Sequence, residues 1–283
     1  MFTKLNILFL FLSYFIAVQA QETIPFRLTQ YNNIIVKALV NDKDSLHLMF
    51  QIAMGDASIS PERTRKADHI IFNKDEISEN NTIQLGKVIT KNVRFFDNEL
   101  TGHEADGKFG TGVFAGKIFK IDYDNNKFVI YDQLPDLKAY QAIKLYPERD
   151  QLFINADNII DGKSIEGHFL LQSGYAGGLL YNNQFAEDNG LEKKLEVTGE
   201  KTLKNSSGKS VITKQGILPQ FKIGNIMMEN VSAGFFAGDL KTQKVSYFAA
   251  DMIRRFIWIF DTDRKTAYIK PSKYFSAPYY KIN

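Results

Sequence analysis

One pattern occurs twice in this sequence, as His47-Leu48-Met49-Phe50-Gln51-Ile52-Ala53 and as His168-Phe169-Leu170-Leu171-Gln172-Ser173-Gly174. Each copy begins with a His, continues through three apolar residues and reaches a Gln, and the second Gln lies 121 residues after the first. A short apolar run of this kind is typical of a buried strand. The pattern therefore predicts two equivalent strands, each of which ends at a Gln.

A second correspondence lies downstream of each Gln, at a constant offset of 139 residues. It starts with Phe109-Gly110 and Phe248-Ala249 and continues without a gap. The further matched positions are Phe119 and Trp258, Ile121 and Phe260, Asp122 and Asp261, Asp124 and Asp263, and Val129-Ile130 and Tyr268-Ile269. Because the two offsets differ, the second half must contain extra residues, and the polar stretch 196–214 is a suitable place for them. This self-similarity predicts two similar halves joined between residues 135 and 157.

Strand signals dominate the chain, and helical signals are short. Apolar and β-branched runs bounded by polar turns predict strands over residues 34–40, 46–53, 118–123 and 127–131. The Asn-rich turn between the last two strands predicts a β-hairpin. Short helices are expected over residues 61–67, 182–189 and 251–255. The sequence thus predicts a mainly β fold with a few short helices.

The composition is that of an ordinary globular protein, and the N-terminus predicts export. The chain has 283 residues, of which 44% are apolar and 24% charged, so it can bury a sizeable core. A net charge of +3 is too small to indicate a nucleic acid as partner. Residues 1–20 contain Lys4, an apolar run over residues 7–18 and small residues before Gln21. These features predict a signal peptide that is cleaved near Gln21.

The absence of Cys limits the reactions that the protein can catalyse and the ways in which it can be anchored to a membrane. It excludes disulfides, thiolate nucleophiles and Cys-ligated metals, and also a lipid-modified Cys at the mature N-terminus. We therefore expect a secreted or periplasmic protein without a membrane anchor. The four His residues have no metal-ligand spacing, and the Gly-rich segment 174–178 has no phosphate-loop Lys. The sequence therefore indicates neither a metal nor any other cofactor.

The repeated pattern resembles the aspartic peptidases, in the retropepsin-like and pepsin-like sense, and in particular the exported bacterial aspartyl protease family proteins. In that family each lobe supplies an apolar strand ending in Asp-Thr/Ser-Gly, and a later apolar-apolar-Gly step passes beside the Asp loop. The matching segments here are 48–53 with 108–110, and 169–174 with 247–249. The resemblance implies a two-lobed acid-protease-type β-barrel fold, with an N-terminal lobe over residues 21–150, a C-terminal lobe over residues 151–283 and a cleft between them.

The sequence departs from the family pattern where the chemistry would take place. Both Asp positions are Gln here, at Gln51 and Gln172. The first half has also lost the hydroxyl residue and the Gly, whereas Ser173, Gly174 and Gly110 keep the pattern. Aspartic proteolysis needs two carboxylates that share one proton, and a Gln amide does not titrate near neutral pH. No catalytic residue is therefore assigned.

The resemblance and the departures together lead to one main functional hypothesis and two alternatives. The main hypothesis is a catalytically degenerate protein whose cleft binds an extended peptide or other polymer by backbone pairing. The residues that would line this cleft are Gln51, Gly110, Gln172, Ser173 and Gly174. The first alternative is an active peptidase or hydrolase. Its carboxylates would lie elsewhere in the chain, as at Asp56, or would be supplied when two chains form a dimer. The remaining alternative is a purely structural or interaction module, in which the lobe interface has closed and no cleft remains. The other Asp residues of the repeat are assigned to turns, as is Asp106.

Overall fold

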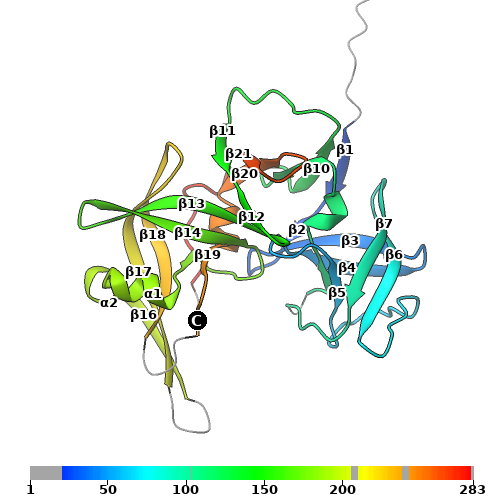
Figure 1. Ribbon diagram of the computed structural model, residues 1–283, viewed down its shortest axis with the longest axis horizontal. Helices are drawn as coiled ribbons and strands as arrows, with labels where there is room; N and C mark the ends of the chain where they lie inside the picture. The colour runs from blue at the N-terminus through cyan, green and yellow to red at the C-terminus, as the bar shows by residue number, and fades with distance from the viewer. Residues whose placement is uncertain (1–20, 103, 205–209, 238–241, 282–283) are drawn as a thin grey trace, which may run out of the picture.

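The computed structural model describes residues 21–102, 104–204, 210–237 and 242–281, and its strands form three sheets (Figure 1). The helices within these ranges are short: η1 (Thr111–Phe114), α1 (Asn183–Asp188), α2 (Leu191–Lys194) and α3 (Ala250–Ile253). No helix in the described ranges has the length and apolar character needed to cross a membrane. The predicted mainly β class is confirmed, and the predicted signal peptide at residues 1–20 lies outside the described residues.

The first barrel is built around the strand that leads to Gln51. Its strands are β2 (Arg27–Leu28), β3 (Ile34–Val40), β4 (Asp44–Phe50), β5 (Ala57–Ile59), β6 (Ile77–Leu85), β7 (Val88–Phe96) and β8 (Gly107–Phe109). They lie in the order β2-β3-β4-β8-β5-β7-β6, and pairing of β3 with β6 closes the barrel. Strands β4 and β8 run parallel, with Phe50 opposite Phe109, and both rings are fully buried. The strand that leads to Gln51 is therefore held at its end by core packing.

The second barrel has the same strand order with one additional strand. Its strands are β12 (Tyr146–Glu148), β13 (Gln151–Ile160), β14 (Lys163–Gln172), β15 (Leu179–Leu180), β16 (Glu196–Lys204), β17 (Ser210–Ile223), β18 (Ile226–Ala237) and β19 (Ser246–Ala249). The order is β12-β13-β14-β19-β15-β18-β17-β16, and pairing of β13 with β17 closes the barrel. Strands β14 and β19 run parallel, with Leu171 opposite Phe248. The additional strand, β16, falls in the stretch 196–214 where the sequence predicted extra residues.

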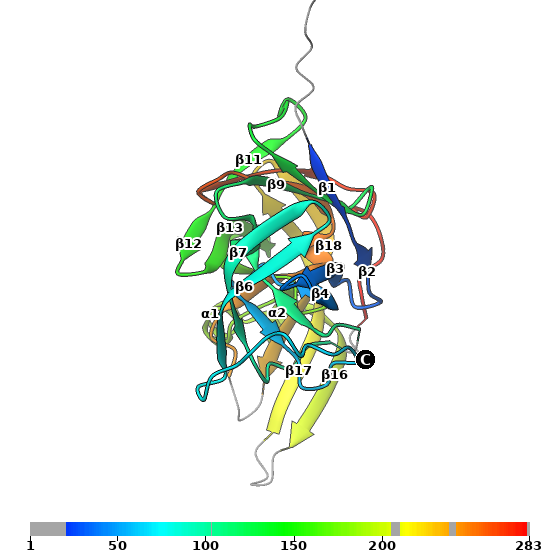
Figure 2. The ribbon, with the colours of Figure 1, turned by 90° about the vertical axis from the view of Figure 1, so that its right-hand side faces the viewer.

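A third sheet contains strands from both halves and lies between the two barrels, at the top of the view in Figure 1 (Figures 1 and 2). Its strands are β1 (Glu22–Pro25), β10 (Lys127–Tyr131), β9 (Ile118–Asp122), β20 (Phe256–Phe260), β21 (Thr266–Pro271) and β11 (Gln141–Lys144), in that order. At its centre β9 pairs with β20, with Lys120 opposite Ile259, Phe119 opposite Phe260 and Ile121 opposite Trp258. Lys120 and Ile259 are equivalent positions of the two halves and pair with each other, and the equivalent positions on either side of them pair crosswise. The two halves are therefore related by a local two-fold axis that passes through the Lys120–Ile259 pair.

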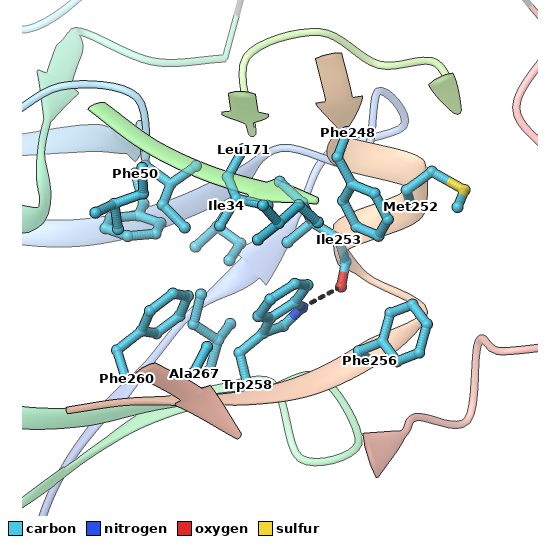
Figure 3. Packing of buried hydrophobic residues seen from close by; sticks show 14 of the residues in the cluster. Ile34, Phe50, Leu171, Phe248, Met252, Ile253, Phe256, Trp258, Phe260 and Ala267 are labelled. Atoms are coloured by element: carbon cyan, nitrogen blue, oxygen red, sulfur yellow. Dashed lines mark hydrogen bonds between the residues drawn. The ribbon is translucent and has the colours of Figure 1, made fainter. Parts of the chain in front are cut away.

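One apolar core continues from the first barrel through the joining sheet into the second barrel. Figure 3 shows the side chains of β20 facing Phe50 from one barrel and Phe248 from the other. Trp258 is fully buried, its indole Nε1 donates to the carbonyl of Ile253 at 2.8 Å, and its ring lies 5.9 Å from that of Phe248. Phe260 stacks on Phe119 with the ring centroids 4.8 Å apart. This shared aromatic core fixes how the two barrels sit relative to one another.

Most predicted elements are confirmed, but two need correction. The strand expected over residues 46–53 is β4, and it ends at Phe50 because Gln51 turns into a loop in which Met54 N donates to Gln51 O at 3.3 Å. The helix expected over residues 61–67 is absent. The backbone N–H groups of Thr64 and Arg65 instead donate to the carboxylate of Asp106, which holds the segment in an irregular conformation. The placement of the lobe boundary at residue 150 stays a prediction.

Candidate binding site at the junction of the lobes

The loops that follow β4 and β14 bring Gln51 and Gln172 into contact. Gln51 Nε2 donates to Gln172 Oε1 at 2.5 Å, and both side chains are half-buried. The Gln172 oxygen also accepts the backbone N–H of Gly174 at 3.1 Å. The backbone N–H of Gln51 donates to the carbonyl of Phe109 at 2.9 Å, which extends the β4–β8 pairing by one residue. The two side chains that the sequence placed face to face are thus observed in direct contact.

Ser173 connects the second loop to the first barrel. Its hydroxyl oxygen accepts the backbone N–H of Ile52 at 3.0 Å and lies 2.9 Å from both Phe50 O and Gln51 Oε1. Because the hydroxyl has one proton, it donates to one of these two oxygens at a time. The side chain is buried, so these bonds are shielded from water. Ser173 therefore fastens the end of β14 to the end of β4.

Two Asn residues in the loop before β3 make further bonds across the junction that the sequence did not predict. Asn33 Nδ2 donates to the carbonyl of Ser173 at 2.7 Å, and Asn32 Nδ2 donates to the carbonyl of Ala176 at 3.1 Å. Asn32 adopts a left-handed conformation with φ of 65°, which Asn tolerates better than most residues. Side-chain bonds to a distant backbone leave no periodic pattern, so only the turn character of Asn32-Asn33 was visible in the sequence.

The two glycines predicted at the site have different surroundings. A Cβ on Gly174 would lie 2.9 Å from Gln51 Nε2 and 3.2 Å from Gln172 Oε1, so Gly174 makes room for the Gln pair. A Cβ on Gly110 would lie 2.1 Å from the backbone oxygen of Met54, so this glycine allows β8 to pass against the loop after Gln51. The structure therefore brings Gln51, Gln172, Ser173 and Gly174 together, and it places Gly110 against the loop backbone.

Asp56, the candidate for a relocated acid, is held in an ion pair. Its Oδ2 accepts both Nε and Nη2 of Arg94 on β7, at 3.0 and 2.7 Å. The hydrogen bond that the Arg94 guanidinium donates to Asp56, together with the negative charge of Asp56, raises the pKa of Arg94. This pair ties the loop after Gln51 to β7, and it gives Asp56 a structural role that does not favour its use as a general base.

Asp106 has a larger structural role than the turn expected from the sequence. This buried carboxylate, located just before β8, accepts the backbone N–H of His47 at 2.8 Å and Arg65 Nη1 at 3.1 Å. Burial alone would raise the pKa of Asp106, but these bonds together with the backbone N–H of Arg65 hold it below its usual value. Asp106 thereby anchors β4 four residues before Gln51. Turn chemistry does hold for Asp122, which accepts Asn125 N at 3.1 Å, and for Asp261, which accepts Lys265 N at 2.9 Å.

The loop that follows each Gln lines part of a hollow, and neither Gln51 nor Gln172 is among the lining residues. One, of about 380 Å³, is lined by residues 53–56 of the first loop, by Arg94 and by Arg149 and Asp150 of the turn between β12 and β13. The other, of about 390 Å³, is lined by Tyr175, three residues after Gln172, and by β16, β17 and β18. The first is charged and the second mixes charged and aromatic side chains. The described residues contain no group of three or more His, Cys, Asp or Glu side chains placed to hold a metal ion.

Comparison with solved structures shows the class of fold. The chain is similar to the crystal structure of an aspartic proteinase from Irpex lacteus, with a TM-score of 0.57 and 10% sequence identity, over 91% of this chain and 99% of that chain. At this identity the likeness shows the fold alone, which is the predicted two-lobed acid-protease-type fold. No family model matches the sequence, and no curated protein is similar to it.

The contrast between the two glycines generates a testable prediction. We expect Gly110→Ala to destabilise the protein by about 3 kcal/mol or more, because the added methyl group meets backbone that cannot move aside. Gly174→Ala should cost about 1 kcal/mol, because the methyl group meets the flexible ends of two side chains. Urea denaturation followed by circular dichroism measures both values. Equal losses for the two variants would contradict these surroundings.

The lowered pKa of Asp106 predicts a pH-dependent contribution to stability. Its pKa in the unfolded chain is about 3.9, so the contribution is fully present above that pH and is lost as the pH falls through the lower folded-state pKa. We expect Asp106→Asn to cost about 1–3 kcal/mol at pH 7, because one of the two acceptor oxygens becomes an NH2 group that faces N–H donors. The cost should shrink below about pH 4. Asp132→Asn, at an exposed site, is the control, and a constant cost from pH 7 to 2 would refute the assignment.

Proposed function

We propose that this protein is an exported, catalytically degenerate aspartic-peptidase-like protein that binds an extended peptide or other polymer between its lobes. The observation that carries the proposal is the contact between Gln51 and Gln172 at 2.5 Å, at the ends of equivalent strands of the two barrels. In the family that the sequence resembles, these strand ends carry the two catalytic Asp residues. We propose that Gln51 and Gln172, a pair of neutral amides, take the place of those two Asp residues in this protein.

The chemistry of amides supports the loss of peptidase activity. Two carboxylates in contact share one proton, and the split of their pKa values makes one a base and the other an acid. Gln51 and Gln172 have no such titration, and they can only donate and accept hydrogen bonds. General acid–base catalysis contributes about 10²–10⁴-fold for each group, so turnover by this mechanism would be lost.

The surroundings of the pair support peptide binding. The loops that carry the two Gln residues each line part of a hollow, and side chains of an extended ligand would have space there. Extended peptides bind through regularly spaced backbone groups, with pockets for alternate side chains. Gly174 is exposed beside the pair, so the backbone at this point is accessible to a ligand. These features are properties of the scaffold, so they do not depend on catalysis.

Export is part of the proposal and rests on the leader-like composition of residues 1–20, while the absence of Cys excludes a lipid-modified Cys at the mature N-terminus. If the leader is cleaved as proposed, mass spectrometry of the chain recovered from outside the cytoplasm will show an N-terminus near Gln21. A chain that keeps Met1 would contradict this part of the proposal. Binding between the lobes would be unaffected by that result.

The binding function is tested with unfolded casein and a pool of casein peptides from pH 3 to 8. We expect no cleavage products at any pH, because the pair cannot activate a water, together with saturable binding measured by fluorescence anisotropy. Turnover that is inhibited by a statine-type compound would overturn the proposal. If turnover occurs and Asp56→Asn abolishes it, the alternative of relocated carboxylates would be correct.

A further inference from the structure

The hydrogen bonds around the Gln pair fix which way each amide is turned. The backbone N–H of Gly174 can only donate, so the Gln172 atom 3.1 Å away must be the oxygen. That same oxygen receives the Gln51 amide, which must therefore present its nitrogen. Gln51 Oε1 then lies 2.9 Å from the hydroxyl of Ser173, which can donate to it. The whole arrangement is thus set by one backbone donor that cannot be reversed.

This orientation leaves N–H groups unused in the pair. Gln51 Nε2 has two N–H groups, and it donates one of them to Gln172 Oε1. Gln172 Nε2 has no acceptor among the described hydrogen bonds, and it does not belong to the described buried atoms that lack a partner. Gln172 is half-buried beside the exposed Gly174, so its two N–H groups remain available to a ligand. The pair thus keeps donors available and uses both of its oxygens as acceptors within the junction.

We propose that Gln172 Nε2 is a specificity-determining donor that binds an acceptor oxygen of the peptide ligand, namely a backbone carbonyl within an extended chain. This inference rests on the proposed function, and it adds that the site donates hydrogen bonds to its ligand. A carboxylate pair accepts hydrogen bonds and holds a water, whereas this pair donates and takes a carbonyl oxygen directly. The C-terminal carboxylate of a peptide also offers acceptor oxygens, so the test peptides must distinguish a backbone carbonyl from a C-terminal carboxylate.

Two substitutions that make the same chemical change separate this donor role from the structural role of the pair. In Gln172→Glu the carboxylate still accepts from Gly174 N and Gln51 Nε2, while the available donor becomes a negative charge. In Gln51→Glu a carboxylate faces the oxygen of Gln172, so Gln172 must turn and lose the Gly174 bond, or the two acceptors repel one another. We therefore expect Gln172→Glu to melt like the wild type at pH 7, and Gln51→Glu to melt several degrees lower.

Binding is measured by anisotropy with fluorescent casein peptides that are N-acetylated and C-amidated, and with the same peptides carrying a free C-terminal carboxylate. We expect amidated and free-acid peptides to bind the wild type alike, and Gln172→Glu and Gln172→Met to bind at least 10-fold more weakly. Gln133→Glu makes the same charge change at an exposed site in the loop after β10 and should bind like the wild type.

Each other outcome has a definite meaning. Unchanged binding by Gln172→Glu would overturn the donor assignment while leaving the proposed function in place. Binding of the free-acid peptides alone would overturn the assignment to a backbone carbonyl. A wild-type protein that binds no peptide would overturn the proposed function and this inference with it. Equal melting temperatures for Gln51→Glu and Gln172→Glu would overturn the amide orientation, whatever the binding result.

Discussion

The hydrogen bond from Gln51 to Gln172 is the contact on which the arrangement of the two loops depends. It forms where β4 and β14 end, and both strands are held at that point by parallel neighbours, β8 and β19. Ser173 adds bonds to Phe50, Gln51 and Ile52, so the second loop is fastened to the first barrel by several groups. Next to the end of β4, Phe50 packs against Phe119 of the joining sheet, in which the pairing of β9 with β20 fixes the orientation of the barrels. The loops therefore meet because the strand ends and the sheet against which they pack are both constrained.

Neutral amides suit this contact for a physical reason. Two ionised carboxylates at the same separation would repel one another, and one of them would have to stay protonated. An amide pair forms its mutual hydrogen bond at every pH, because one partner donates while the other accepts. The contact between Gln51 and Gln172 therefore does not depend on the protonation of either side chain.

The sequence predicted the parts of this structure that leave a local or repeated pattern. The apolar runs into Gln51 and Gln172, and the ungapped match of β9 with β20, predicted the β class and two similar halves, and the resemblance to the aspartic peptidases implied that the two Gln side chains meet. The sequence did not reveal the bonds from Asn33 to Ser173 and from Asp106 to His47, which join residues 140 and 59 positions apart. Such contacts depend on tertiary geometry rather than on periodicity. Segment 61–67 was misassigned for the same reason, since Asp106 overrides its weak helical preference.

A double-mutant cycle on Gln51 and Gln172 tests the central claim most directly. The free energy of unfolding is measured by urea denaturation for the wild type, Gln51→Ala, Gln172→Ala and the double variant. A direct hydrogen bond between the two side chains predicts a coupling energy of about 0.5–1.5 kcal/mol, because either single substitution removes the same bond. Losses that add to within about 0.3 kcal/mol would show that the side chains act independently, and would contradict a junction built on their contact.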